Sequence, residues 1–372
     1  MTMSSTLDTR ETPAPGDRVA APRETASGGR RLAHVEVVRG LVCALVVVYH
    51  AIGSDPLHGL RLPEGSWPWM LNRFLDLVDM PLFAFVSGWV FGIVTDRPER
   101  FVAAFGKKFI RLGVPLIVVT AIYLVLVRVS GHGVATGVWA AYLLPFEHLW
   151  YLQASLWLLA VAAVGSWIFR RRPMAFAVGI TLASIAAFLA VPTFEFNLLS
   201  IQQAIYLAPY FFLGHLLART SESGLVSFEG SRDLRIILPL IGLMAFALTA
   251  VWILYRTGAT GVMQSAPALL FAIALALAVS VAAPHARLLE ALGQRSYTIY
   301  LFHVISMAPT RMILLKIWPD IPLPLAFVII VGAGLAVPSL IHAVVSRHPA
   351  SAFLIEGIVP RRRGATARGE AT

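Results

Sequence analysis

The sequence has a single cysteine, Cys43, among its 372 residues. One cysteine excludes an intrachain disulfide and a zinc site built from cysteine ligands. Charged residues are also scarce: they make up 13% of the chain, against about 25% in an ordinary soluble domain. These two shortages argue against a disulfide-stapled domain and against a typical soluble globular protein.

Hydrophobic residues, in contrast, make up 58% of the chain, and the mean hydropathy is +0.75. Apolar runs of about 20 residues recur, which is the length that a helix needs to cross a bilayer. We therefore predict an all-α fold, a polytopic bundle of about ten transmembrane helices. The predicted spans are 33–53, 73–94, 109–130, 149–169, 174–191, 198–218, 235–256, 263–283, 296–316 and 324–345.

The net charge of +10 follows the positive-inside pattern of membrane proteins and does not indicate nucleic-acid binding. Basic residues gather in alternate loops, whereas the other loops are nearly free of them. The loops predicted to be cytoplasmic carry Arg97, Arg100, Lys107, Lys108, Arg170, Arg171, Arg172, Arg219, Arg232, Arg235, Arg287 and Arg295. Both termini are therefore predicted to lie in the cytoplasm.

The chain divides into three predicted segments. Residues 1–30 are rich in Thr, Ser, Ala, Pro and Gly without an apolar run, which is typical of a disordered tail. This tail lacks the apolar core of a cleavable signal peptide, so we expect the first span to direct insertion. Residues 31–348 form the membrane domain, and residues 349–372 form a basic cytoplasmic tail. No loop is long enough for a second soluble domain.

The first predicted span places three ionisable side chains on one helical stripe. Eleven steps of about 100° bring His50 to within roughly 20° of Arg39, about 16 Å along the axis, and Glu36 lies one turn before Arg39. A charge at the bilayer centre costs about 2.5–3.5 kcal/mol, so we expect this stripe to face a protein-lined cavity. The alternative is that Glu36 and Arg39 pair near the cytoplasmic boundary while His50 lies at the other interface.

Two further patterns lie in the second and third spans. The run Met80–Trp89 contains Pro81 and a Ser-Gly pair, and such residues allow close helix contact or a kink beside a cavity. Helix packing is the favoured interpretation there. At the start of the third span, Lys108 and Arg111 lie one turn apart and can contact one polyanion. An ordinary topogenic cluster that contacts anionic lipid headgroups is the alternative.

Polar residues mark the starts of the fourth and ninth spans. An interfacial aromatic belt would explain Trp150 and Tyr151 without a functional role, but it leaves Glu147 and His148 unexplained. In the ninth span a polar stripe is predicted at positions i, i+4 and i+7, with a further tyrosine beside it. The alternative is a polar helix–helix contact. The residues concerned are Ser296, Tyr297, Tyr300 and His303.

Taken together, these patterns resemble the acyltransferase 3 family of integral membrane O-acyltransferases. The resemblance covers roughly residues 30–345. In that family the first-span arginine and histidine are essential to activity, and they correspond to Arg39 and His50. Two positions depart from the family pattern, because Glu36 stands where aspartate is usual and Lys108 stands where arginine is usual.

The resemblance implies transfer of an acyl group, most often acetyl, from a cytoplasmic acyl-coenzyme A to a hydroxyl of a carbohydrate or related acceptor. An alcohol is a poor nucleophile at neutral pH, so a base must remove its proton, and we assign that role to His50. Lys108 and Arg111 are expected to bind the coenzyme A phosphates, with Arg39 deeper in the membrane and Glu36 orienting Arg39.

The remaining residues of these patterns are expected to contact the substrates: His148, Trp150, Ser296, Tyr297, Tyr300 and His303. The expected partners are acyl-coenzyme A, with acetyl-coenzyme A as the donor, a hydroxylated acceptor and the lipid bilayer. Neither a metal ion nor a nucleic acid is expected. The high Ala, Val, Leu and Arg usage indicates a GC-rich bacterial genome, and the predicted location is the bacterial inner (plasma) membrane.

Two other classes of protein stay open at this point. A transporter or flippase of glycolipid or polysaccharide precursors would also have about ten spans and cavity-facing charges. It would neither consume acyl-coenzyme A nor release coenzyme A. A non-catalytic membrane scaffold or sensor would tolerate substitution of Arg39 and His50.

Overall fold

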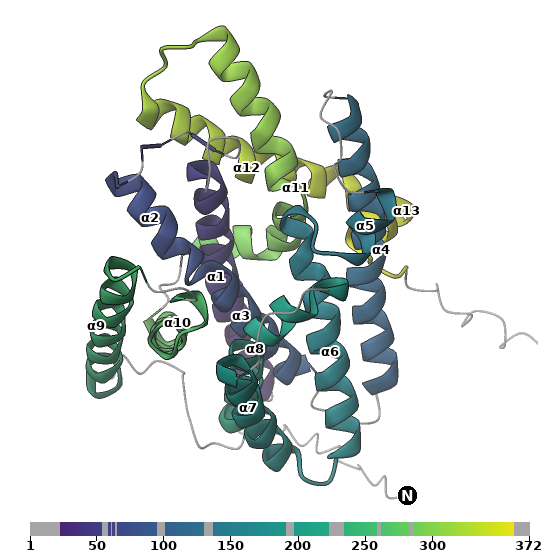
Figure 1. Ribbon diagram of the computed structural model, residues 1–372. Coiled ribbons are helices and arrows are strands. Elements are labelled where there is room, and N and C mark those ends of the chain that lie inside the picture. Colours follow the sequence, from purple (N-terminus) through teal and green to yellow (C-terminus); the bar gives the residue numbers. More distant parts are fainter. Residues whose placement is uncertain are drawn as a thin grey trace, which may run out of the picture.

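A computed structural model of the chain describes residues 23–53, 59–60, 62–63, 65–94, 101–129, 137–190, 197–222, 234–258, 262–282 and 286–360. Within these ranges the chain forms helices and no strand, which confirms the predicted all-α membrane bundle (Figure 1). Much of both predicted tails, residues 1–22 and 361–372, lies outside the described residues. The same holds for the predicted loop cations Arg97, Arg100 and Arg232.

The helices follow one another along the chain and several lie side by side with partners far away in sequence. In order they are α1 (Arg23–Ile52), α2 (Trp67–Asp76), α3 (Asp79–Val94), α4 (Phe101–Val129), α5 (Val138–Leu143), η2 (Glu147–Leu149), α6 (Trp150–Ile168), α7 (Pro173–Ala190), η3 (Leu198–Ser200), α8 (Ile201–Glu222), α9 (Leu234–Arg256), η4 (Val262–Gln264), α10 (Ala266–Ala282), α11 (Arg287–Ile317), α12 (Leu323–Val345) and α13 (Pro349–Glu356).

Eight helical segments among the described residues are long and apolar enough to cross a membrane, and each coincides with a predicted span. The other two predicted spans fall on α8 and α10. The apolar part of α10 is shorter, and α8 carries polar side chains that include Gln202, His215 and Arg219. Ten crossings and the cytoplasmic placement of both termini therefore stay predictions.

The second predicted span is divided into two helices. α2 ends at Asp76 and α3 begins at Asp79, two residues before Pro81. Proline lacks an N–H to donate and is tolerated in the first turn of a helix, so it favours a new helix start at this point. The Asp79 carboxylate accepts a hydrogen bond from the Met80 N–H at 2.6 Å, which satisfies one donor of that first turn.

α1 lies inside the bundle, because α11 packs along it and α3 and α12 cover other parts of its surface (Figure 1). α1 and α11 approach each other so closely that their backbones touch at two glycines. A Cβ added to Gly40 would lie 1.8 Å from the Leu289 carbonyl oxygen, and one added to Gly293 would lie 1.8 Å from the Glu36 carbonyl oxygen. Glycine at both positions therefore allows α1 and α11 to run side by side.

A second glycine-mediated contact joins α3 to α8. A Cβ on Gly88 would lie 1.8 Å from the Phe211 carbonyl oxygen, and one on Gly214 would lie 2.0 Å from the Phe85 carbonyl oxygen. The Ser-Gly pair of the second span thus serves helix packing, as predicted. The two contacts fix the α1–α11 and α3–α8 pairs, between which the core side chains lie.

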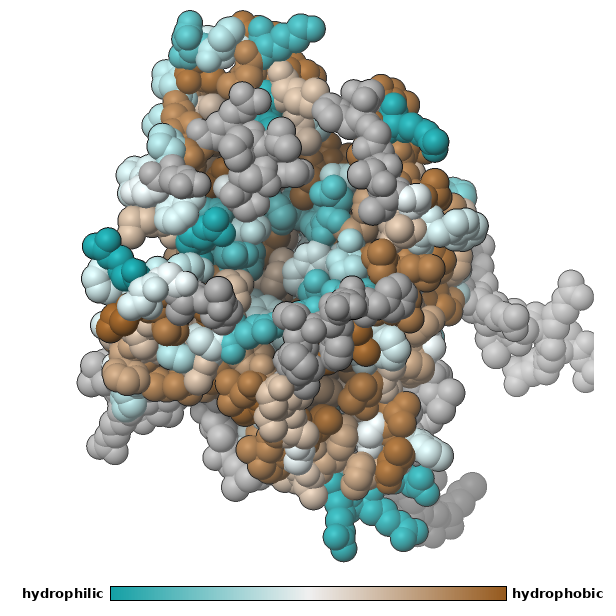
Figure 2. Space-filling model, in the orientation of Figure 1, coloured by the Kyte–Doolittle hydropathy of each residue, from teal (hydrophilic) through white to brown (hydrophobic). Residues whose placement is uncertain are grey.

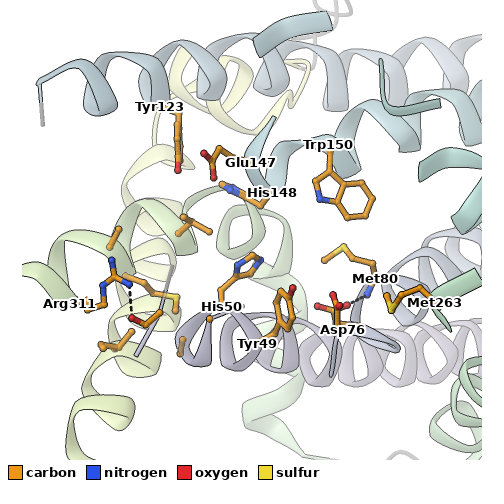
Figure 3. A pocket seen from close by; sticks show the side chains of 18 of the residues that line it. Tyr49, His50, Asp76, Met80, Tyr123, Glu147, His148, Trp150, Met263 and Arg311 are labelled. Carbon is orange, nitrogen blue, oxygen red and sulfur yellow. Dashed lines mark hydrogen bonds between the residues drawn. The ribbon is translucent and has the colours of Figure 1, made fainter. Parts of the chain in front are cut away.

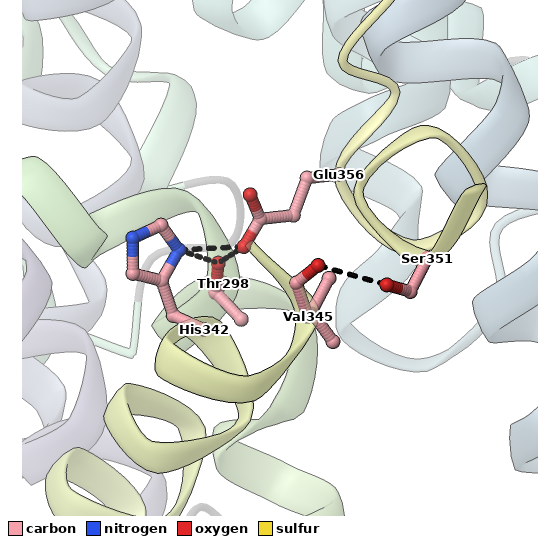
Figure 4. Close-up of polar contacts among 5 residues, drawn as sticks. All are labelled: Thr298, His342, Val345, Ser351 and Glu356. Atoms are coloured by element: carbon pink, nitrogen blue, oxygen red, sulfur yellow. Dashed lines mark hydrogen bonds and ion pairs between the residues drawn. The ribbon is translucent and has the colours of Figure 1, made fainter. Parts of the chain in front are cut away.

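The short helix α13 returns against α4 at the end of the described chain. Its Glu356 is 3% exposed and accepts hydrogen bonds at 2.6 Å from both the Thr298 hydroxyl and His342 Nδ1 (Figure 4). Gly357 then adopts a left-handed conformation (φ 64°), and a Cβ there would lie 2.3 Å from the Cα of Arg111. α13 is therefore docked against the turn of α4 that carries Arg111.

Hydrophobic residues cover much of the visible face of the molecule, as a lipid-facing surface requires (Figure 2). Hydrophilic residues gather around a hollow near the middle of this face. Large apolar side chains on the outer helices are strongly exposed, for example Phe246 at 70% on α9 and Leu182 at 63% on α7. Such side chains are accommodated by lipid, not by water.

Candidate functional site

A cavity of about 390 Å³ lies at the C-terminal end of α1, next to His50 (Figure 3). α1, the α2–α3 junction, η2 and α11 supply most of its polar wall. The titratable side chains that line it are Tyr49, His50, Asp76, Asp79, Tyr123, Glu147, His148, Tyr206 and Arg311. The first-span histidine therefore faces a protein-lined cavity and not the lipid.

Three histidines from three different helical segments meet beside this cavity. The His50 ring centroid lies 4.9 Å from that of His303 and 6.4 Å from that of His148, and the His148 and His303 centroids are 5.0 Å apart. His148 is 5% exposed and His303 is fully buried. The close approach of α1 to α11 brings His303 to His50, and η2 supplies His148 from the other side.

Backbone carbonyls fix the tautomers of the two buried rings. His148 Nε2 lies 3.2 Å from the Leu301 carbonyl oxygen, and His303 Nδ1 lies 2.7 Å from the Tyr300 carbonyl oxygen. A carbonyl only accepts, so each of these nitrogens must carry the proton. The other nitrogens, His148 Nδ1 and His303 Nε2, are then bare acceptors, and both are buried without a hydrogen-bond partner among the described residues. Unsatisfied buried acceptors of this kind are uncommon in proteins.

Tyrosines pack around this histidine cluster. The Tyr300 hydroxyl donates to the His148 carbonyl, and the Tyr300 ring lies 5.7 Å from the His148 ring. Tyr151 stands 5.6 Å from Tyr300 and shares a 3.0 Å hydrogen bond with Ser87. Tyr151 is only 6% exposed, so the interpretation of this residue as an interfacial belt tyrosine was wrong. Trp150, by contrast, lines the cavity.

Arg39 and Glu36 form an ion pair on the same turn of α1. Arg39 Nη1 donates to Glu36 Oε1 at 2.8 Å, and the two side chains are 24% and 23% exposed. The second Glu36 oxygen is buried, and no other residue that the structure describes is hydrogen-bonded to it. Arg39 is also within electrostatic reach of the buried Tyr151. The pair therefore lies at the bundle interior, on the α1 stripe that leads to His50.

Two cationic side chains of α4, Lys108 and Arg111, lie one turn apart and contact different neighbouring helices. Lys108 Nζ lies 4.4 Å from the centroid of the Phe91 ring on α3. The Arg111 guanidinium lies 5.4 Å from the centroid of the Tyr297 ring on α11, and the Tyr297 hydroxyl donates to the Arg111 carbonyl. Stacking on aromatic rings orients both cations without neutralising them, so they are still able to bind an anion.

The predicted residues of α11 separate into two environments. Ser296 is fully buried and its carbonyl lies 3.8 Å from the Cys43 sulfur of α1, so it belongs to the α1–α11 contact. Tyr297 lies beside Arg111, whereas Tyr300 and His303 lie in the histidine cluster. Ser296 and His303 of the predicted i, i+4, i+7 stripe therefore contact α1, whereas Tyr300 between them packs against Phe83, His148 and Tyr151.

The sequence interpretation missed two acidic residues of the cavity wall, Asp76 and Asp79. Both lie inside the second predicted span, where an ionisable residue is a functional candidate by default, so the signal was present. It missed Tyr123 too, which lines the cavity beside Glu147 (Figure 3). Nothing in the local sequence of the third span distinguishes this tyrosine from a packing residue.

No cluster of three or more His, Cys, Asp or Glu side chains with metal-binding geometry occurs in the described part of the chain. The three histidine rings therefore do not form a preorganised metal site. Two bare acceptor nitrogens and one cavity-facing imidazole are suited instead to receiving protons or donated hydrogen bonds.

The model of one protein family, described as an acyltransferase domain, matches residues 32–343. This match includes α1 to α12 apart from the ends, and with them the histidine cluster, the Arg39–Glu36 pair and both α4 cations. No curated protein and no solved structure matched the chain.

Proposed function

The chain belongs to the acyltransferase 3 family and is a membrane acyltransferase, and we propose that it transfers an acyl group from acyl-coenzyme A to a hydroxyl of a carbohydrate or related acceptor. The proposed donor is acetyl-coenzyme A, and the proposed location is the inner membrane of a bacterium. The observation that carries this proposal is the position of His50, which lines the cavity and is backed by His303.

In the proposed reaction His50 takes the proton of the acceptor hydroxyl as its oxygen attacks the thioester carbonyl. An oxygen–carbon bond forms, the carbon–sulfur bond breaks, and the His50 proton passes to the departing sulfur. The products are an ester and free coenzyme A. Protonated His50 needs a hydrogen-bond acceptor, and the bare Nε2 of His303 lies on the adjoining ring. This supports His303 as the residue that orients His50.

The donor is proposed to approach from the opposite end of α1. Lys108 and Arg111 are the proposed partners of the coenzyme A phosphates, since guanidinium and ammonium groups bind phosphate by charge-assisted hydrogen bonds. Arg39 and Glu36 lie between that end and His50. About 16 Å of helix separates Arg39 from His50, which is of the order of an extended pantetheine arm, so the thioester can reach the base directly.

An acceptor-dependent release of coenzyme A tests the proposal. The purified protein in lipid nanodiscs is given acetyl-coenzyme A with and without an alkyl glycoside, and free thiol is measured with a thiol reagent. The only cysteine, Cys43, is buried, so the protein itself adds little background. We expect thiol release that requires both substrates, together with an acetylated glycoside in the product.

The same measurement separates the proposal from the transporter alternative. A transporter or flippase would move the glycoside across the membrane and release no coenzyme A. If a folded protein binds both compounds but releases no thiol and forms no ester with a panel of hydroxylated acceptors, acyl transfer is the wrong activity.

A further inference from the structure

The cavity next to His50 has an unusual charge balance for a site inside a membrane protein. Among the residues that the structure describes, three carboxylates line it, Asp76, Asp79 and Glu147, against one guanidinium, that of Arg311. Arg311 Nη1 donates to the Gly59 carbonyl at 2.6 Å, so this cation is already engaged at the far end of the cavity (Figure 3). None of the three carboxylates forms an ion pair with another residue that the structure describes.

A structural role explains the carboxylate of Asp79 but not that of Asp76. Asp79 begins α3 and caps the Met80 N–H, so a structural role suffices for it. Asp76 is the last residue of α2, and a negative charge at the C-terminal end of a helix is disfavoured by the helix dipole. Arg73, one turn earlier, is stacked over Trp69 at 5.2 Å. Arg73 is within electrostatic reach of Asp76 but forms no ion pair with it, so α2 offsets this carboxylate only in part and leaves it on the cavity wall.

The backbone of Glu147 adopts a strained conformation. Its φ of 44° puts it in the left-handed region, which a residue with a side chain rarely adopts. Such strain is concentrated at functional sites. Tyr123 stands beside the Glu147 side chain, which points into the cavity next to His148 (Figure 3).

An independent feature of the cavity points to a ligand that donates hydrogen bonds. His148 is 5% exposed and lines the cavity, and its bare Nδ1 has no hydrogen-bond partner in the part of the chain that the structure describes. The faces of Tyr49 and Trp150 add electron-rich rings to the same wall. Carboxylates, a bare imidazole nitrogen and aromatic faces all favour a cationic, donor-rich ligand and disfavour an anion.

We infer that this cavity binds an acceptor that carries a protonated amine beside the hydroxyl to be acylated, as in an amino sugar, and that the carboxylates of Asp76 and Glu147 on its wall stabilise the ammonium group electrostatically. This inference rests on the proposed acyl transfer. The pairing also has a chemical consequence: a free amine is a better nucleophile than a hydroxyl, but an ammonium group has no lone pair. Carboxylates that keep the amine protonated direct the acyl group to oxygen.

The test compares three probes with the same pyranose ring: methyl glucosaminide, methyl glucoside and methyl glucuronide, which carry an amine, a neutral hydroxyl and a carboxylate. Binding to the protein in nanodiscs is measured by saturation-transfer NMR, and coenzyme A release from acetyl-coenzyme A is measured in parallel. We expect the amine probe to bind about tenfold more tightly than the neutral one and the glucuronide to bind most weakly.

The double variant Asp76→Asn/Glu147→Gln should remove the preference for the amine and leave binding of the neutral probe within about twofold. The matched control is Asp320→Asn, which removes an exposed carboxylate from the α11–α12 connection, outside the cavity. It should keep the wild-type order of affinities.

Several results would overturn the inference: glucuronide binding as tight as that of the amine, an amine preference that survives in the double variant, or no detectable binding of the amine probe. Failure of the proposed function gives a different pattern, in which the amine preference is present and depends on Asp76 and Glu147 but no probe elicits coenzyme A release. Release of coenzyme A without an amine preference leaves acyl transfer standing and removes the inference.

Discussion

At the scale of single residues, the site depends on which nitrogen of each histidine carries a proton. The Leu301 carbonyl fixes the proton of His148 on Nε2, and the Tyr300 carbonyl fixes the proton of His303 on Nδ1. The other nitrogen of each ring therefore carries a lone pair that can accept a hydrogen bond. The arrangement has the logic of a catalytic base oriented by a second group that stabilises its protonated form. In the proposed reaction the orienting group is the His303 imidazole, which the α11 backbone holds in place.

Replacement of His303 tests this orienting role. His303→Leu should lower kcat about 10²-fold and leave the KM for acyl-coenzyme A unchanged, because the lost contact is to protonated His50 and not to the donor. His303→Gln places an amide oxygen near the former Nε2 and should recover part of the activity. Steady-state kinetics of both variants, with unfolding temperatures measured beside them, check the prediction. Equal losses in the two variants would indicate a packing role only.

The α4 cations are tested by their effect on the donor. Lys108→Ala together with Arg111→Ala should raise the KM for acyl-coenzyme A at least tenfold, since each charge-assisted contact contributes about 1.5–3 kcal/mol. The KM for the acceptor should not change. The matched control is Arg171→Ala with Arg172→Ala, two exposed cations of the α6–α7 turn. A change in the acceptor KM instead would mean that these residues do not serve the donor.

Some residues of the site could be predicted from the sequence and others could not, depending on whether a local pattern marked them. The shared stripe of Arg39 and His50 follows from helical geometry alone, and the structure places His50 at the cavity. The meeting of His148 and His303 with His50 depends on how distant helices pack, which periodicity does not specify. Asp76 needed no packing information, because an acidic residue in an apolar span already indicates function.

At the scale of helices, two pairs of glycines determine the arrangement. Gly40 and Gly293 let α1 and α11 touch, and this contact puts His50 against His303, ten residues further along each helix. The sequence indicated helix packing for the second span, but a glycine gives no sign of which helix it will contact. The break between α2 and α3 was likewise missed, although Pro81 was recognised as an interruption of that span.

Adding one methyl group at the α1–α11 contact should be costly. Gly293→Ala puts a Cβ 1.8 Å from the Glu36 carbonyl oxygen, so the helices must separate, and we expect a loss of about 1–3 kcal/mol with a large fall in activity. Gly332→Ala on α12, where nothing lies within 4 Å of the added atom, should stay within about 0.5 kcal/mol of wild type. Thermal unfolding in nanodiscs measures both. Similar unfolding temperatures for the two variants would contradict the close contact.

At the scale of the whole molecule, the proposed reaction requires a donor side and an acceptor side at opposite ends of α1. Composition and apolar runs were sufficient to predict a helical membrane bundle, because the bilayer allows few other folds. They did not establish the number of crossings, since α8 carries polar side chains and α10 is short. The positive-inside pattern predicts which end faces the cytoplasm.

Cysteine labelling tests that orientation with little interference, because Cys43 is the only native cysteine. In a Cys43→Ala background, Arg171→Cys in the α6–α7 turn should react with a membrane-impermeant maleimide only after the cells are opened. Asp320→Cys, between α11 and α12, should react in intact cells. The reverse pattern would place the α4 cations on the outside, where no acyl-coenzyme A is present.

The most direct test of the central claim is the activity of His50→Ala in the coenzyme A release assay, with the exposed His348→Ala as its matched control. If His50 is the proton acceptor, the substitution should lower the rate about 10³-fold while the unfolding temperature and acyl-coenzyme A binding stay at wild-type values. A well-folded His50→Ala protein that keeps its rate within tenfold of wild type would contradict the account.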